Sequence, residues 1–284
     1  MNVAFVTDSG TGLSVKEVEA LGCYSVPLQI AYDDVSLLEN EDINVDGVYT
    51  LMQEGKMLKT SLAPVGKIEE LFTRLKEAGY DMIFAVPICS GLSGTANAMQ
   101  MVAKQVGIEF DYFDNHVTAM VEEYMVVRAK ALYDEGKTIE EIKKVLADIC
   151  DSTNTLLIPN DLQHLKRGGR LTPLAATLGG LLKIKPILEI NQKTQGKIDV
   201  LDKVRTMSKA LDRSVEIMKK QILDGGQGYS ITVAHVVAKT EGEGLIEKYK
   251  QTFPNANYNL IKLVGVVGVH TGLGCLAVQY FKKL

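Results

Sequence analysis

Short apolar runs alternate with helical patterns in the first half of the chain. Apolar runs of strand length cover residues 3–6 and 82–88, and a further strand is expected at 108–113. Before the second run, apolar side chains recur at the i, i+3, i+4 and i+7 spacing of one helical face, at Ile68, Leu71, Phe72 and Leu75. A further helix is expected at residues 94–106. This order of strand, helix and strand predicts parallel pairing of the strands.

Two more helices are predicted at residues 119–133 and 139–149, and the polar segment 150–154 that follows is rich in turn-forming residues. A chain of 284 residues is beyond the size at which one hydrophobic core usually stops growing, so we expect two domains. We place the boundary in the polar segment, with an N-terminal domain at 1–154 and a C-terminal domain at 155–284. The first is expected to be a three-layer α/β/α domain with a mainly parallel sheet.

The second half of the chain has a different order of elements. Strands are predicted at residues 155–158, 187–190, 198–201, 229–236 and 257–264, and helices at 171–182, 204–223 and 242–253. Turn-forming residues around Gly196 join the second and third of these strands. We therefore expect an α/β domain with helices on one face of a mixed sheet.

Composition and charge argue against one class of partner. The chain is 46% hydrophobic and 23% charged, as in an ordinary globular protein, and its formal net charge is -4. Binding to nucleic acid depends largely on the neutralisation of phosphates by Lys and Arg. We therefore expect no nucleic-acid partner.

The sequence shows no export signal and no membrane span. Asp8 interrupts the apolar run near the start of the chain. The apolar stretch 178–188 is broken by Gly, Lys and Pro, well short of the roughly 20 residues that a spanning helix needs. The cysteines are far apart and form no metal-ligand pattern, at positions Cys23, Cys89, Cys150 and Cys275. We expect free thiols, no bound metal and a cytoplasmic location.

Hydroxyl and glycine residues gather where the strand at 82–88 meets the helix at 94–106. The sequence there is CSGLSGT, with Ser90, Ser93 and Thr95 as its hydroxyl residues. Backbone N–H groups at a helix start, together with hydroxyl donors, can bind a phosphate or a carboxylate. A Walker A loop and a three-glycine dinucleotide fingerprint are absent, so nucleotide binding has no support. The alternative is that Ser93 or Thr95 only caps the helix.

Three further segments contain candidate binding residues. Thr60 and Ser61 precede a helix, either as ligand-binding hydroxyls or as helix caps. Two glycines precede Arg170, whose guanidinium either binds a carboxylate or phosphate or belongs to a solvated basic loop. Glycines also frame His270, which is either a hydrogen-bond donor or proton carrier, or a buried core residue.

In this order, the motifs resemble the DegV family of bacterial fatty-acid-binding proteins. The resemblance rests on VTDS at 6–9, Thr60-Ser61, SGLSGT at 90–95, LKRGGR at 165–170, LKIKPIL at 182–188 and HTG at 270–272. It spans almost the whole chain. The sequence departs from the family at Cys89, where a serine is usual, and at Leu62-Ala63-Pro64, where Gln-Pro-Ser is usual. Both departures bear on the shape of the pocket and on the preferred chain length of the ligand.

The resemblance implies that two α/β domains close over one long-chain fatty acid, such as palmitate or oleate, with its carboxylate near the domain interface. Carried over residue by residue, it implies that the carboxylate is bound by Thr60, Ser93 and His270, with Ser61 and Gly94 beside them. It gives a supporting or partner-facing role to Arg170, Ser90 and Thr271.

The resemblance also implies a lipid carrier and not an enzyme. In some family members the bound acid is presented to a separate ATP-binding kinase subunit, which phosphorylates the carboxylate. The carrier itself would then need no cofactor, and the fatty acid would be its ligand.

Two other functions stay open at this point. One is an enzyme that uses His270 and the loop at Ser93 on a small carbonyl or phosphorylated substrate, with the histidine as base or nucleophile. The other is a structural or regulatory protein whose lipid is incidental. Hydrolysis has no specific support, because a Ser-His-Asp order, a paired-carboxylate motif and a nucleophile elbow are all absent from the sequence.

Overall fold

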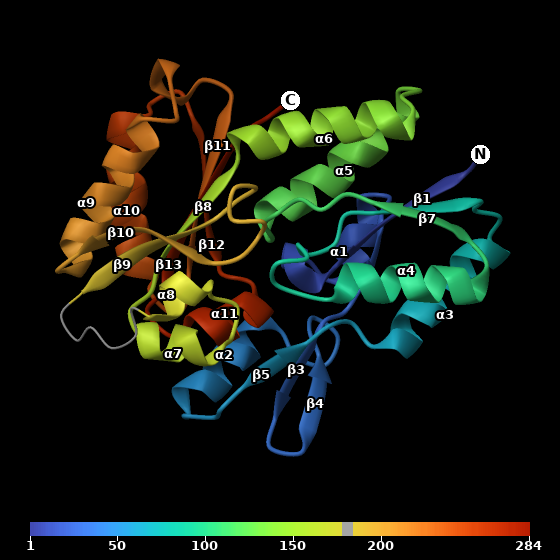
Figure 1. Ribbon diagram of the computed structural model, residues 1–284, viewed down its shortest axis with the longest axis horizontal. Coiled ribbons are helices and arrows are strands. Elements are labelled where there is room, and N and C mark those ends of the chain that lie inside the picture. Colours follow the sequence, from blue (N-terminus) through green and yellow to red (C-terminus); the bar gives the residue numbers. More distant parts are fainter. Residues whose placement is uncertain (178–183) are drawn as a thin grey trace. The chain divides into compact units, whose positions relative to one another are not determined.

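A computed structural model of the chain describes residues 1–177 and 184–284 (Figure 1). The chain divides into two compact units. The N-terminal unit consists of Met1–Asp148 and Val264–Val266, and the C-terminal unit of Ile149–Leu263 and Val267–Leu284. A short segment late in the sequence therefore belongs to the N-terminal unit.

The N-terminal unit contains a parallel sheet with the strand order β2-β1-β6-β7. Its strands are β1 (Val3–Asp8), β2 (Tyr24–Val26), β6 (Met82–Ala85) and β7 (Glu109–Tyr112). Every residue of β1 and β6 is buried. Strands that are buried along their whole length are typical of parallel sheets covered on both faces. The prediction of parallel pairing is confirmed.

Helices cover both faces of this sheet. The helices in this part of the chain are α1 (Val15–Ala20), α2 (Val45–Gln53), α3 (Val65–Glu77), α4 (Thr95–Val106), α5 (Met120–Asp134) and α6 (Ile139–Ser152), with a 3-10 helix at Ser9–Thr11, and those that pack on the sheet are α1, α3, α4 and α5. Helices α3 and α4 pack on each other, and α5 packs on β1. Figure 1 shows α3 and α4 on one side of β1 and β7, and α5 on the other. The predicted three-layer arrangement is confirmed.

The helix α6 is longer than the sequence pattern predicts. Residues 150–152 were expected to form a turn, but they are the last residues of α6. The reason is that Cys150 continues the buried stripe of this helix, which includes Ile142, Leu146 and Ile149.

A small antiparallel sheet with the order β4-β3-β5 was not predicted from the sequence. It consists of β3 (Gln29–Tyr32), β4 (Val35–Leu38) and β5 (Lys59–Ser61). Strand β5 carries the candidate binding residues Thr60 and Ser61.

The C-terminal unit contains a mixed sheet with the order β10-β9-β8-β13-β11-β12. Its strands are β8 (Asn154–Ile158), β9 (Lys185–Ile190), β10 (Asp199–Val204), β11 (Tyr229–His235), β12 (Asn257–Lys262) and β13 (Leu276–Lys282). Strands β11 and β12 run parallel, and the other neighbouring pairs run antiparallel. The prediction of a mixed sheet is confirmed, although β13 was missed.

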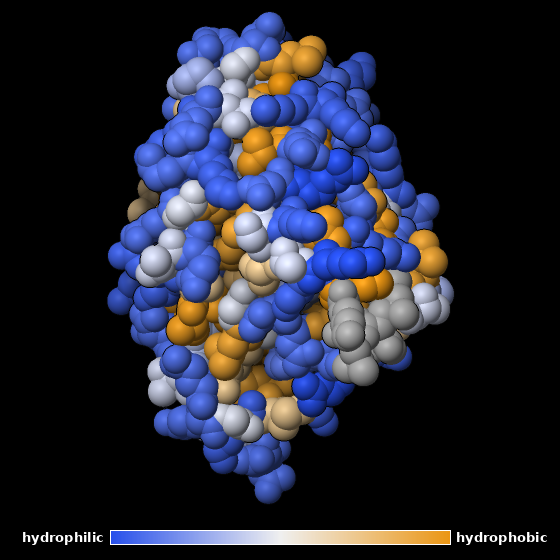
Figure 2. Space-filling model, turned by 90° about the vertical axis from the view of Figure 1, so that its left-hand side faces the viewer, coloured by the Kyte–Doolittle hydropathy of each residue, from blue (hydrophilic) through white to orange (hydrophobic). Residues whose placement is uncertain are grey.

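Two long helices, α9 (Met207–Lys219) and α10 (Lys239–Thr252), pack on this sheet. Their buried side chains, such as Leu245 and Tyr249, form one core with strand residues such as Leu156 and Val233. The outer face of α9 is polar, and hydrophilic residues prevail over hydrophobic ones on the side of the molecule to which α9 belongs (Figure 2).

Short helices complete the C-terminal unit: α7 (Leu162–Arg167), α8 (Pro173–Thr177), α11 (Gly265–Thr271) and a 3-10 helix at Asp224–Gly226. Helix α8 covers part of the helix predicted at 171–182, and residues 178–183 lie outside the described residues. The glycine-rich segment that contains His270 was not predicted as a helix, but it forms α11.

None of the helices among the described residues has the length and apolar character of a membrane-spanning helix.

All four cysteines are free and buried, as expected.

Candidate functional site

Two hydroxyl groups meet at the start of α4 in the N-terminal unit. The hydroxyl oxygens of Ser93 and Thr95 are 2.9 Å apart and share a hydrogen bond. Gly94 is the N-cap residue of α4, and no side chain makes a capping hydrogen bond there. The structural alternative, in which Ser93 or Thr95 caps this helix, is therefore wrong. A helix start with adjacent hydroxyls remains suited to an anionic oxygen.

The Thr60-Ser61 motif approaches the same loop through the small antiparallel sheet. Leu62 directly follows β5, and a Cβ atom added to Gly94 would lie 3.6 Å from Leu62 Cδ2. The two hydroxyl-containing segments are thus neighbours. Ser61, Ser90 and Gly94 are exposed, whereas Thr60 is half-buried.

In the C-terminal unit, the two glycines after α7 bring Arg170 to His270. A Cβ atom added to Gly168 would lie 2.5 Å from His270 Nδ1, so a glycine is needed for the imidazole to lie this close. Arg170 Nη1 donates a hydrogen bond of 2.8 Å to the Gly168 carbonyl oxygen. Two motifs that are far apart in the sequence therefore form one cluster.

His270 is a neutral side chain at pH 7. Burial lowers its pKa from 6.5 to about 4, and the positive charge of Arg170 and the neighbouring His164 act in the same direction. A neutral imidazole has one N–H donor and one acceptor nitrogen. The next residue, Thr271, is only 1% exposed.

A buried network of carboxyl groups in the N-terminal unit was not predicted. Glu122 accepts hydrogen bonds from Thr7 (3.0 Å) and Thr118 (3.1 Å), and it also shares a hydrogen bond with Asp8. Two carboxyl groups can share a hydrogen bond only if one of them holds a proton. Burial raises the pKa of Asp8 to about 6 and that of Glu122 well above its usual range.

A third buried carboxyl group, Glu39, connects three separate segments. It accepts a hydrogen bond of 2.6 Å from Ser9 Oγ and one of 2.8 Å from the Val266 N–H. Ser9 Oγ in turn accepts from the Leu28 N–H (3.0 Å). Burial raises the pKa of Glu39 to about 7. Glu39 thus holds the start of α11 against the first strand.

Gly10 is required by this network. A Cβ atom at Gly10 would lie 2.7 Å from both Asp8 Oδ1 and Glu122 Oε2. One signal in the sequence points to Glu122: it stands at helical spacing from Met125, Val126 and Ala129, on the apolar face of α5. For Glu39 the sequence offers no comparable signal.

Within residues 1–177 and 184–284, no cluster of His, Cys, Asp and Glu is arranged to hold a metal ion.

Comparisons with known proteins cover the whole chain. The sequence profile of the DegV family, described as a family of uncharacterised proteins, matches residues 2–283. A DegV domain-containing protein of Listeria monocytogenes is 31% identical over 286 residues, which is 99% of each chain.

Solved structures match over the same length. The crystal structure of DegV, a fatty acid binding protein from Bacillus subtilis, covers 100% of both chains at 27% identity with a TM-score of 0.88. The fatty acid binding DegV family protein of Streptococcus agalactiae has the same coverage and identity and a TM-score of 0.89. The chain belongs to the DegV family.

Proposed function

We propose that the chain binds one long-chain fatty acid, such as palmitate or oleate, and carries it. The observation that supports this most is the full-length likeness to the B. subtilis and S. agalactiae structures, both described as fatty acid binding. The acyl chain supplies most of the affinity in this proposal, because burial of each methylene contributes roughly 0.8 kcal/mol.

In the proposed complex the carboxylate accepts hydrogen bonds from Thr60 and Ser93, and His270 is a further donor. The pKa of His270, lowered to about 4, supports this role because a neutral imidazole donates without forming a buried ion pair. The desolvation of a buried ion pair is expensive, so neutral donors suit a site that must also accept an apolar tail.

We further propose that the chain is a carrier and not an enzyme, and that it presents the carboxylate to an ATP-binding kinase subunit. Arg170, half-buried and next to His270, is our candidate for the contact with that partner.

The first test is mass spectrometry of an organic extract from the purified full chain. A fatty acid in one-to-one ratio with the protein is the expected result. An empty extract, followed by no binding of added palmitate or oleate, would refute the carrier function and favour the alternative enzyme acting through His270.

The second test measures palmitate affinity in Ser93→Ala and Thr60→Ala. Each variant is expected to bind about tenfold to a hundredfold more weakly, as for the loss of a hydrogen bond to a charged group, and to remain folded. Ser208→Ala, at an exposed position of α9, is the matched control. Unchanged affinity in both site variants would refute the assigned hydroxyls even if the acid itself binds.

A further inference from the structure

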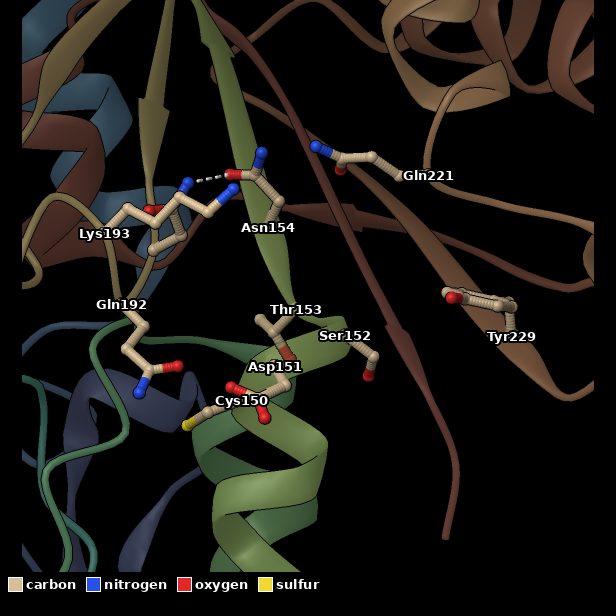
Figure 3. A pocket seen from close by; sticks show the side chains of 10 residues that line it. Cys150, Asp151, Ser152, Thr153, Asn154, Gln192, Lys193, Gln221 and Tyr229 are labelled. Carbon is tan, nitrogen blue, oxygen red and sulfur yellow. Dashed lines mark hydrogen bonds between the residues drawn. The ribbon is translucent and has the colours of Figure 1, made fainter.

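A separate pocket lies in the C-terminal unit (Figure 3). It is lined by the end of α6, the start of β8, the turn after β9, the residue Gln221 after α9 and the residue Tyr229 at the start of β11. Its volume is about 310 Å³, which is at the lower end of the range of small-molecule pockets. The residues proposed to bind the fatty acid do not line it.

The lining of this pocket is polar throughout. Each side chain that the structure describes around it carries a nitrogen, oxygen or sulfur atom. Small-molecule pockets are usually lined mainly by apolar side chains, so this lining is unsuited to an acyl chain. A ligand that makes many hydrogen bonds fits it better.

The back wall of the pocket is fixed by hydrogen bonds. Asn191 Nδ2 donates to Asn154 Oδ1 (3.0 Å) and to Glu189 Oε2 (2.8 Å), and Asn154 Nδ2 donates to the same Glu189 oxygen (3.0 Å). Asn154 is 3% exposed and Asn191 is 7% exposed. The two amides are therefore held in place before any ligand arrives, which reduces the entropy cost of binding.

The mouth of the pocket consists of exposed side chains. Gln192, Lys193 and Gln221 are exposed, and Tyr229 is half-buried. In Figure 3 the amide of Gln221 and the hydroxyl end of Tyr229 point toward the side on which Asn154 lies. Gln221 Oε1 already accepts a hydrogen bond from the Tyr280 hydroxyl, so Gln221 offers its N–H groups to a ligand. The Gln192 amide and the Tyr229 phenol offer both donors and acceptors, which matches a ligand whose groups also do both.

The charges around the pocket argue against a charged ligand. One carboxylate, Asp151, and one ammonium group, Lys193, line it, and the Glu189 carboxylate behind the wall already accepts hydrogen bonds from the amides of Asn154 and Asn191. The pocket also lies at the C-terminal end of α6, which ends at Ser152. Because a helix C-terminus carries a partial negative charge, it disfavours an anion, while Lys193 disfavours a cation.

We propose that this pocket binds a small uncharged polyhydroxylated molecule of the sugar or polyol class. Hydroxyl groups donate and accept as the amides do, and they need no counter-charge. The proposal is independent of the fatty-acid site, because the two sets of residues do not overlap.

The test is a titration of the isotope-labelled full chain with glucose, myo-inositol and glycerol, followed by NMR. At least one probe is expected to bind saturably, with shift changes at the backbone amides of Asn154, Asn191 and Gln192. Gln192→Ala and Gln221→Ala are expected to weaken that binding about fivefold each, as for the loss of one neutral hydrogen bond. Gln251→Ala, exposed on α10 and outside the pocket, is the matched control and should leave affinity unchanged.

Three results would overturn the proposal. One is the absence of saturable binding by all three neutral probes. Another is binding that both pocket variants leave unchanged, since the probe would then occupy a different site. The third is tighter binding of glucose 6-phosphate or glucosamine than of glucose, since these probes add a charge to the same ring and would show that the pocket selects for charge.

Discussion

The two glycines before Arg170 are required for different reasons. Gly169 has a φ of +72°, in the left-handed region that favours glycine. Gly168 has an ordinary φ of -66°, but it lies against the imidazole of His270, where a Cβ atom would be 2.5 Å from Nδ1. The imidazole can therefore lie where it does only because Gly168 has no side chain.

Gly168→Ala is expected to displace the His270 ring. Forcing a methyl group into a packed site destabilises a protein by about 1–3 kcal/mol, which denaturant unfolding measures. If His270 bonds the carboxylate, the variant also loses palmitate affinity.

The matched control for this change is Gly244→Ala in α10, where an added Cβ atom meets nothing within 4 Å. Alanine is the better helix former, so the control should be unchanged or more stable by up to about 1 kcal/mol. A Gly168→Ala variant as stable and as tightly binding as its control would contradict the close approach.

At the scale of elements, α11 is a helix whose sequence does not favour one. Its sequence GVVGVHT combines glycines with β-branched residues, which have low helix propensity. All of its residues except His270 are buried, and Glu39 accepts the Val266 N–H at its start. Packing and this acceptor stabilise α11, whereas local propensity does not.

Glu39→Gln tests this bond through the pH dependence of stability. Burial raises the pKa of Glu39 from 4.5 to about 7. Between these values the native carboxyl holds a proton that the unfolded chain releases, so the free energy of unfolding falls as pH rises. At about 1.36 kcal/mol per pKa unit, the fall is on the order of 3 kcal/mol. Glutamine cannot ionise, so urea unfolding of the variant at pH 5 and pH 8 should show a smaller difference.

Asp8 and Glu122 titrate in both proteins, so the difference between the two proteins comes from Glu39 and its interaction with the Asp8 charge. Glu54→Gln, at an exposed position, controls for the loss of a negative charge. Its free energy of unfolding should change with pH as in wild type. If the free energy of unfolding changes equally with pH in Glu39→Gln and in wild type, Glu39 does not titrate in this range.

The same elements show what sequence patterns can and cannot predict. Helix α3 was predicted because four buried side chains repeat at helical spacing over several turns. Strand β5 has only three residues, Lys59–Ser61, without an apolar one among them, so no pattern exists to detect. The bond from Glu39 to Val266 joins distant parts of the sequence, and only tertiary structure reveals such a contact.

At the scale of the whole molecule, family membership and site chemistry have different support. The collinear motifs predicted the family, and matches over residues 2–283 confirm it. The motifs also pointed to Ser93, Arg170 and His270 as candidate site residues, and the structure shows Arg170 next to His270. The roles of these residues toward a ligand are proposals, because a role depends on the bound molecule and not on the fold.

Arg170→Ala tests the proposed division between binding and transfer. Arg170 donates to the Gly168 carbonyl and lies next to His270, but the acyl chain supplies most of the proposed affinity. We therefore expect palmitate affinity within about threefold of wild type, because the hydrogen bond that this variant loses is made to the Gly168 carbonyl and not to the ligand. Acyl phosphate formation by the partner kinase subunit should fall at least about tenfold, because a guanidinium at an interface contributes specific paired hydrogen bonds.

Arg205→Ala, at an exposed position in the same unit, is the matched control and should support full turnover. Full acyl phosphate formation with Arg170→Ala would refute the docking role of Arg170. A large loss of palmitate affinity in that variant would instead assign Arg170 to the carboxylate site itself, because the residue would then act before any partner is present.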